Sequence, residues 1–170
     1  MKTPFTYFFL FFLLLGTQTV YAQKFEVPKE YTLKAPEDFT KYKDQVVAAV
    51  NWMNRTPLAT DTAKRSEVNA FVLAWISGNP DLTISLHQNI VSFAEINPQL
   101  LIIFMGGWAK FAIINPTDMT NIKGNLAGLR AVFAFYDKNQ ELTPDKSLEK
   151  LIKLNEDGLL RKWIAEQLKS

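Results

Sequence analysis

The sequence predicts an all-α protein, an irregular bundle or a short stack of helical hairpins with six or seven helices and an extended N-terminal arm. Three observations lead to this prediction. Apolar residues recur at intervals of three and four along most of the chain. Asn, Pro, Gly and Asp stand where helices would begin or end. Beyond residue 36, only the segment 81–96 contains the alternation of apolar and polar residues that is typical of a strand.

Residues 1–22 have the order of a secretory signal peptide. Lys2 precedes an unbroken apolar run from Phe8 to Leu15, and a stretch of small and polar residues ends at Ala22. The run is shorter than the roughly 20 residues that cross a bilayer as a helix. We therefore expect cleavage after Ala22 and export to the periplasm or the medium. An inner-membrane protein with an uncut signal, in which residues 100–114 form a second membrane element, is the alternative.

Composition limits what the exported chain can be. Removing 22 of the 170 residues leaves 148, enough for one domain with its own core. The chain has no Cys, which fits an exported bacterial domain better than a small disulfide-stapled one. Its net charge is +2 before cleavage, and no Lys/Arg run is dense enough to follow a phosphate backbone. We therefore expect neither nucleic-acid binding nor, once the signal is removed, an integral membrane segment.

Residues 23–36 are predicted to form the extended arm, and residues 37–170 a single helical domain. Pro28 and Pro36 prevent a helix through the arm, whose apolar residues are spaced mostly by even steps. The first helical face then comprises Phe39, Tyr42, Val46, Val50 and Met53. The second comprises Val68, Phe71, Val72, Trp75 and Ile76, and its helix ends at Gly78.

The dipeptide Asn-Pro occurs at 79–80, 97–98 and 115–116, and each is predicted to start a helix because Asn caps helices and Pro suits their first position. Residues 81–96 are ambiguous. Leu82, Ile84 and Leu86 alternate as in a strand, whereas Leu86, Ile90 and Phe93 fit a helix, which we favour.

The segment Leu100–Ile114 is apolar apart from two glycines and Lys110, and it is predicted to be a central helix covered by its neighbours. The helix predicted over 118–136 is rich in Gly and Ala, so its axis can approach Gly106-Gly107 closely. Thr143 is the predicted N-cap of the last section, in which Gly158 bends or breaks the helix.

Catalytic and metal-binding patterns are weak. His87 is the only histidine, and no nucleophile motif surrounds it. One His and no Cys exclude the usual zinc sites, and the loop that starts at Asp137 lacks the Gly and Glu of an EF-hand. No Gly-rich phosphate loop is present. We therefore expect no metal site and no cofactor.

Two features of the sequence suggest a binding site: Lys110, a charge among aromatic residues, and the high density of Trp and Phe. A charge in an apolar segment needs a partner or must reach the surface, and aromatic residues are enriched at recognition surfaces. The candidate binding residues are Trp108, Lys110, Arg130 and Tyr136. We expect an exported module that binds a protein or small ligand without catalysis; the alternative is a carboxylate-based hydrolase acting on envelope polymers.

Overall fold

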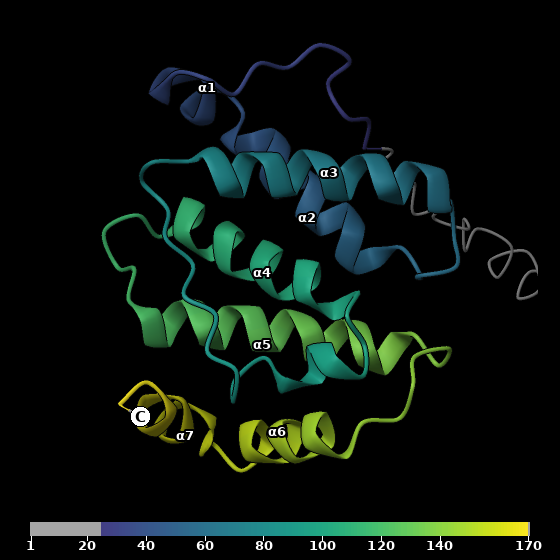
Figure 1. Ribbon diagram of the computed structural model, residues 1–170, viewed down its shortest axis with the longest axis vertical. Coiled ribbons are helices and arrows are strands. Elements are labelled where there is room, and N and C mark those ends of the chain that lie inside the picture. Colours follow the sequence, from purple (N-terminus) through teal and green to yellow (C-terminus); the bar gives the residue numbers. More distant parts are fainter. Residues whose placement is uncertain (1–24, 170) are drawn as a thin grey trace, which may run out of the picture.

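The computed structural model describes residues 25–169. The predicted signal peptide and the first two residues of the predicted arm lie outside this range. The described chain is all-helical, as predicted, with seven α-helices, one 3₁₀ turn and no strand among residues 25–169. The helices lie in successive layers along the long axis of the molecule: α1 to α3, then α4 and α5, then α6 and α7 (Figure 1). This arrangement is a short, irregular stack of helical hairpins.

The predicted arm is extended and lies across the first layer without forming a strand. Its apolar side chains pack against the core: Phe25, Val27, Tyr31 and Leu33. The Tyr31 ring meets the ring of Phe71 edge-on at 4.9 Å between centroids. These contacts fix the position of the arm beside α2 and α3.

The first predicted helix is divided at Tyr42 into α1 (Pro36–Lys41) and α2 (Lys43–Arg55). Trp75 Nε1 donates to the carbonyl oxygen of Phe39 at 2.9 Å, which occupies an acceptor that a continuous helix would use for Lys43. The predicted apolar face is confirmed, since all five of its side chains are buried.

Helix α3 (Thr62–Gly78) ends at the predicted residue, and its predicted apolar face is entirely buried. The rings of Phe71 and Trp75 meet those of Tyr42 and Phe39 edge-on. Aromatic side chains therefore pack α1 and the junction at Tyr42 against the second half of α3.

The helix favoured for residues 81–96 is wrong, and the strand alternative is not formed either. Apart from the 3₁₀ turn η1 (Ser92–Glu95), the segment is irregular and crosses the α4–α5 layer (Figure 1). Extended chain covers about 3.3 Å per residue against 1.5 Å in a helix, so it can span this layer in few residues. Ile90 and Phe93 anchor the crossing in the core.

Only one of the three Asn-Pro pairs lies at the start of a helix. The backbone oxygen of Asn97 accepts from Leu100, the first residue of α4 (Leu100–Ile114). Asn79 and Asn115 instead are the C-caps of α3 and α4. Asn stabilises backbone geometry at both ends of helices, so the dipeptide marks a boundary without giving its direction.

The predicted close contact between Gly106-Gly107 and the small residues of the next helix is confirmed for Gly107. A Cβ on Gly107 would lie 2.6 Å from that of Ala131 and 3.0 Å from the carbonyl oxygen of Ala127, both on α5 (Asn121–Lys138). Gly106 instead faces Val50 of α2. Helix α4 is thus covered by α5 on one side and α2 on the other.

The last layer contains α6 (Lys146–Glu156) and α7 (Leu160–Gln167). The predicted N-cap Thr143 is wrong: the cap is Asp145, which accepts from the amides of Ser147 and Leu148. Gly158 separates the two helices as predicted, with a φ of 72° that favours Gly.

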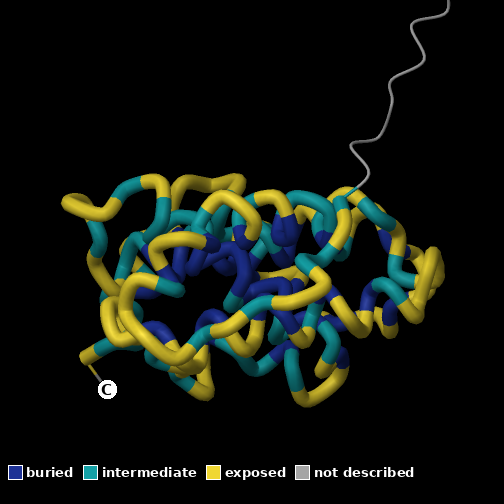
Figure 2. Tube along the Cα trace, turned by 90° about the horizontal axis from the view of Figure 1, so that it is seen from above, coloured by how far each residue is buried: buried dark blue, intermediate teal, exposed yellow. Residues whose placement is uncertain are grey.

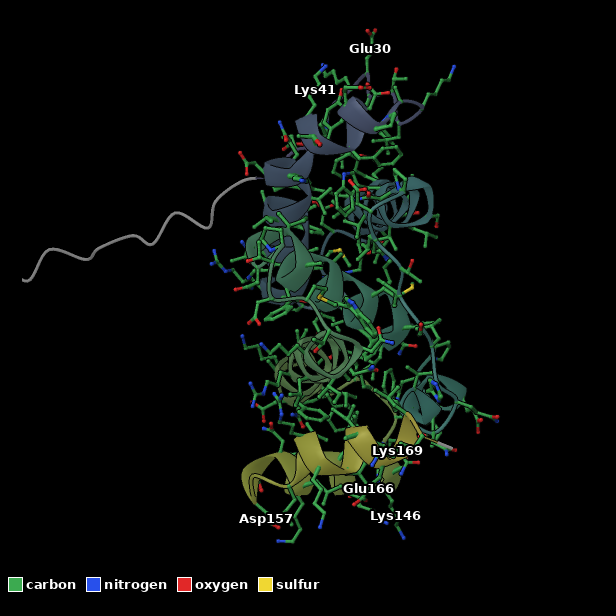
Figure 3. The ribbon with its side chains drawn as sticks, turned by 90° about the vertical axis from the view of Figure 1, so that its left-hand side faces the viewer. Glu30, Lys41, Lys146, Asp157, Glu166 and Lys169 are labelled. Atoms are coloured by element: carbon green, nitrogen blue, oxygen red, sulfur yellow. The ribbon has the colours of Figure 1, made fainter. Side chains whose placement is uncertain are left out.

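The buried side chains form one continuous cluster that runs through the three layers, seen in the interior of Figure 2. Charged side chains point outward at both ends of the molecule (Figure 3). Glu30 and Lys41 mark the end formed by the arm and α1, and Asp157 and Glu166 mark the end formed by α6 and α7.

Candidate functional site

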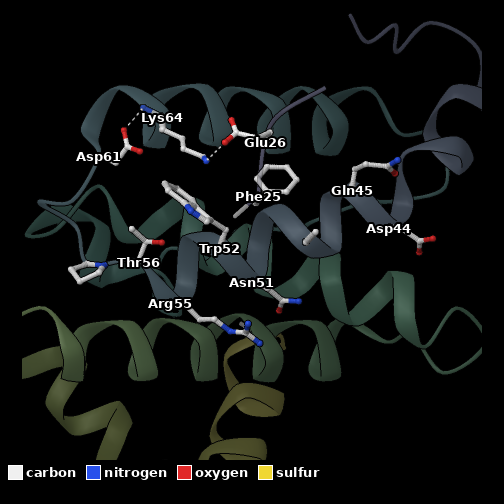
Figure 4. A pocket seen from close by; sticks show the side chains of 12 residues that line it. Phe25, Glu26, Asp44, Gln45, Asn51, Trp52, Arg55, Thr56, Asp61 and Lys64 are labelled. Atoms are coloured by element: carbon white, nitrogen blue, oxygen red, sulfur yellow. Dashed lines mark hydrogen bonds and ion pairs between the residues drawn. The ribbon is translucent and has the colours of Figure 1, made fainter. Parts of the chain in front are cut away.

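A groove of about 820 Å³ follows the outer surface of α2. We call it the α2 groove. Its walls come from α2, the arm, the loop after α2 and the start of α3 (Figure 4). The lining residues are Phe25, Glu26, Asp44, Gln45, Ala48, Asn51, Trp52, Arg55, Thr56, Pro57, Asp61 and Lys64.

Helical spacing explains why α2 has both a core face and a groove face. The six lining residues of α2 lie at intervals of one, three or four from one another, whereas the four buried residues of the helix lie between them. Asp44 and Arg55 are close to opposite ends of the helix, so the groove runs along nearly its whole length (Figure 4).

An ion pair joins the arm to α3 across the groove. Lys64 Nζ lies 3.0 Å from Glu26 Oε1, and the Lys64 side chain is only 14% exposed against 64% for Glu26. The same ammonium lies 5.5 Å from the centre of the Trp52 ring. Lys64 therefore contributes a cation–π contact as well as the ion pair.

Asp61 positions Lys64 at the start of α3. Its Oδ1 accepts from the Lys64 amide at 3.3 Å, and it is the only described non-glycine residue with a positive φ, at 49°. Asp tolerates this conformation better than most residues because its short side chain bonds locally. One of the three groove carboxylates thus has a structural role in capping.

Arg65, on α3, anchors the C-terminal end of α2. Its guanidinium donates to the carbonyl oxygens of Met53, Thr56 and Pro57 at 3.4, 2.5 and 3.1 Å. The Trp52 ring lies on one side of it, 5.4 Å away. Burial lowers the pKa of Arg65, and the charge of Glu141 partly offsets this effect. The cation therefore compensates the carbonyl groups that end the helix.

The loop after α2 is fixed by a buried amide. Asn139 Nδ2 donates to the carbonyl oxygen of Phe135 and its Oδ1 accepts from the Leu58 amide, both at 2.6 Å. The wall formed by Thr56 and Pro57 is consequently tied to the end of α5.

The two ends of the groove have exposed polar side chains without a partner in the described part of the chain. Asp44, Gln45 and Arg55 are all exposed, and their side chains make no hydrogen bond or ion pair within residues 25–169. Ala48, also exposed, leaves space between Gln45 and Trp52. The arrangement offers an anionic end, a cationic end and an aromatic middle.

The structure places the four residues singled out from the sequence in different surroundings. Trp108 is fully buried, with its indole nitrogen unpaired beside Gly124. Arg130 Nε donates to Asn155 Oδ1 at 3.2 Å on the surface, and the Tyr136 hydroxyl accepts from the Asp145 amide at 3.0 Å. None of these three lines the α2 groove, and a binding role for them stays a prediction.

Lys110 does not line the groove either, but it contacts a residue that does. It is half-buried, and its Nζ donates to Oδ1 of Asn51, a groove residue, at 2.6 Å. This contact supplies the partner that a charge in an apolar helix needs.

The sequence contains a signal for the groove that lies outside the four candidate residues. Trp52 follows Asn51 and lies outside the predicted apolar face of its helix, where a large aromatic residue indicates a contact beyond that face. The contributions of the arm and α3 could not be seen, because they depend on the packing of distant segments.

Other candidate features of the described chain are smaller or lie elsewhere. A second groove of about 360 Å³ lies where α3 and α4 end and α5 begins. His87 lines neither groove. Within residues 25–169, no three His, Asp or Glu side chains gather closely enough to hold a metal ion.

Comparisons with known proteins do not place the chain in a family. No protein-family model matches it, and neither curated proteins nor solved structures yield a match. Among the described helices, none combines the length and apolar character required to cross a bilayer. What defines the protein is thus an all-α hairpin stack with a mixed polar and aromatic groove.

Proposed function

We propose that the protein is an exported, non-catalytic binding module whose ligand occupies the α2 groove. The observation that supports this proposal most is the groove itself, with an aromatic middle and open polar groups at both ends. Its volume lies within the range of about 300–1,000 Å³ that is typical of small-ligand sites. The ion pair and caps around it hold its walls before any ligand arrives, which lowers the entropic cost of binding.

The proposal includes export because residues 1–22 have the order of a secretory signal peptide. Mass spectrometry of the protein from a bacterial host tests it. We expect a chain that begins at Gln23 in the periplasmic or medium fraction. An intact chain that begins at Met1 and sediments with membranes would support the uncut inner-membrane alternative instead.

A fluorescent probe with an aromatic body and an anionic group tests the groove directly. We expect anilinonaphthalene sulfonate to bind the folded protein saturably, at one site, because rings fit beside Phe25 and Trp52 and a sulfonate suits Arg55. The variant Ala48→Leu fills the middle of the groove and should weaken binding at least tenfold. Ala134→Leu is the matched control, since it places the same side chain on an exposed helical alanine outside the groove.

Equal probe affinity in the two variants, or no saturable binding by the parent protein, would contradict the proposal. Circular dichroism and urea unfolding of each variant separate a filled groove from a loosened fold. Both substitutions replace an exposed alanine in a helix, so their effects on stability should be small and similar.

The carboxylate-based hydrolase is the second candidate because Glu26, Asp44 and Asp61 all line the same groove. Glu26 is paired with Lys64 and Asp61 caps α3, so Asp44 is the open carboxylate. Release of soluble fragments from purified peptidoglycan, lost in Asp44→Asn, would favour this candidate over simple binding. We expect no such release.

A further inference from the structure

We propose that the occupant of the α2 groove is a short extended peptide with free ends, its amino group beside Asp44 and its carboxylate beside Arg55. This inference rests on the function proposed above and names the class of ligand. Three features of the groove support it: its length, the sign of the charge at each end and the hydrogen-bonding groups between them.

The length of the groove fits about five residues. Asp44 and Arg55 are eleven positions apart on one helix, which corresponds to about 16 Å at a rise of 1.5 Å per residue. An extended peptide advances about 3.3 Å per residue, so about five residues cover this distance. A much longer chain would have to leave the groove at one of its ends.

The charges at the two ends are opposite in sign, and neither side chain makes an ion pair or hydrogen bond within the described chain. Asp44 suits a terminal ammonium, and Arg55 suits a terminal carboxylate, which a guanidinium can bind through two parallel hydrogen bonds. Arg65 already compensates the carbonyl oxygens at the end of α2. The negative end of the helix dipole therefore does not cancel the attraction of Arg55 for an anion.

Between the ends, the groove offers contacts for a backbone and one aromatic side chain. Because Lys110 donates to Asn51 Oδ1, the amide nitrogen of Asn51 is left to donate to a peptide carbonyl. Gln45 can both donate and accept. Ala48 leaves room for a side chain of the peptide beside Trp52 and Phe25. A neutral oligosaccharide could stack on the same rings but would use neither end charge.

Calorimetric titration of the full mature chain with an alanine pentapeptide that has a central phenylalanine tests the proposal. We expect saturable binding that Ala48→Leu removes. Acetylating the amino end or amidating the carboxyl end should each weaken binding about two- to fivefold, the range for partly exposed ion pairs.

The variants assign each end of the peptide to its partner. In Asp44→Asn the effect of acetylation should vanish while that of amidation persists, and in Arg55→Gln the reverse should hold. Asp157→Asn and Arg161→Gln are the matched controls, because both residues are exposed and lie outside the groove. Asp157 follows the last residue of α6, and Arg161 lies on α7. The two control variants should leave both effects unchanged.

Several results would overturn the proposal. One is the absence of peptide binding by a protein that still binds anilinonaphthalene sulfonate in the groove. Another is peptide binding that is indifferent to blocking of both ends. Groove binding of cellopentaose without binding of the peptide would assign the site to a glycan. Failure of the fluorescent probe as well would instead refute the proposed function on which this inference depends.

Discussion

The close packing of α4 on α5 predicts opposite responses to the same substitution at two adjacent glycines. A methyl group on Gly107 would lie 2.6 Å from Ala131 Cβ and 3.0 Å from the backbone oxygen of Ala127. A methyl group on Gly106 would meet only side-chain atoms, with a methyl group of Val50 at 3.2 Å. The two positions share the same helical context, so each serves as the control for the other.

The two variants should differ in their free energy of unfolding. Replacing Gly by Ala inside a helix gains about 1 kcal/mol from propensity. Overpacking a filled core costs about 1–3 kcal/mol. At Gly107 the obstacle includes backbone, so the overpacking cost is about 2–3 kcal/mol, in the upper part of this range, and we expect a net loss of about 1–2 kcal/mol. At Gly106 the Val50 side chain needs to move only a few tenths of an ångström, so we expect a change between zero and a gain of about 0.5 kcal/mol.

Urea unfolding followed by far-ultraviolet circular dichroism measures the difference. For a chain of this size, each kcal/mol corresponds to about 2–4 °C in Tm, which gives an independent check. Adding Ala131→Gly to Gly107→Ala removes the nearest obstacle and should recover part of the loss. If Gly107→Ala proved as stable as Gly106→Ala, the packing of α4 against α5 described above would be refuted.

Three further predictions concern contacts that fix the fold and the groove. Asn97→Ala should lower the free energy of unfolding, measured by urea unfolding, by about 1–2 kcal/mol, because the buried side-chain amide makes two hydrogen bonds with the backbone of Thr143. An unchanged value would contradict a stabilising role for these two bonds. Arg65→Met should lower the free energy of unfolding by about 2 kcal/mol, because the carbonyl oxygens of Met53 and Thr56 lose this donor and that of Pro57 keeps only the Thr60 amide. The loss should be smaller for Arg65→Lys, and equal losses would argue against the capping role. Asp38 accepts from the amides of Lys34 and Ala35, and these two bonds hold its pKa below the ordinary 3.8. Because the folded pKa is the lower one, its stabilisation is complete above the ordinary value and is lost as the pH falls through the folded value. Acid unfolding of Asp38→Asn should lack this component, whereas identical pH profiles for the two proteins would contradict it.

The sequence predicted the fold wherever periodicity alone decides the structure. The buried faces of the first two helical segments and the bounds of the apolar helix at 100–114 follow from the spacing of large apolar residues. The fit of Gly107 against α5 could also be anticipated, because small residues on both segments indicate a close approach.

The sequence was misleading where a distant contact decides the structure. The break at Tyr42 depends on a hydrogen bond from Trp75, which lies 36 positions from its acceptor Phe39. Residues 81–96 have a helical pattern, yet the chain must cross a layer there, and the anchors at Ile90 and Phe93 outweigh local propensity.

None of the four candidate residues lines the α2 groove, for the same reason. Lys110 was singled out as a charge that needs a partner or must reach the surface, and its partner, Asn51, lies on a helix 59 positions away. Trp108 attracted notice as an aromatic residue and is buried, whereas Trp52, outside the buried face of α2, lines the groove. Periodicity distinguishes faces of a helix, but it does not show which polar face lies beside the arm.

The indole resonances of the tryptophans test the central claim most directly. The chain has four Trp residues, of which Trp52 lines the α2 groove and Trp75 and Trp108 are buried in the core. In a nitrogen–proton correlation spectrum titrated with the alanine–phenylalanine pentapeptide, or with anilinonaphthalene sulfonate, we predict that the Trp52 indole signal moves and the other three stay in place. The variant Trp52→Phe assigns the signal. Movement of the Trp108 signal while that of Trp52 stays fixed would contradict the account.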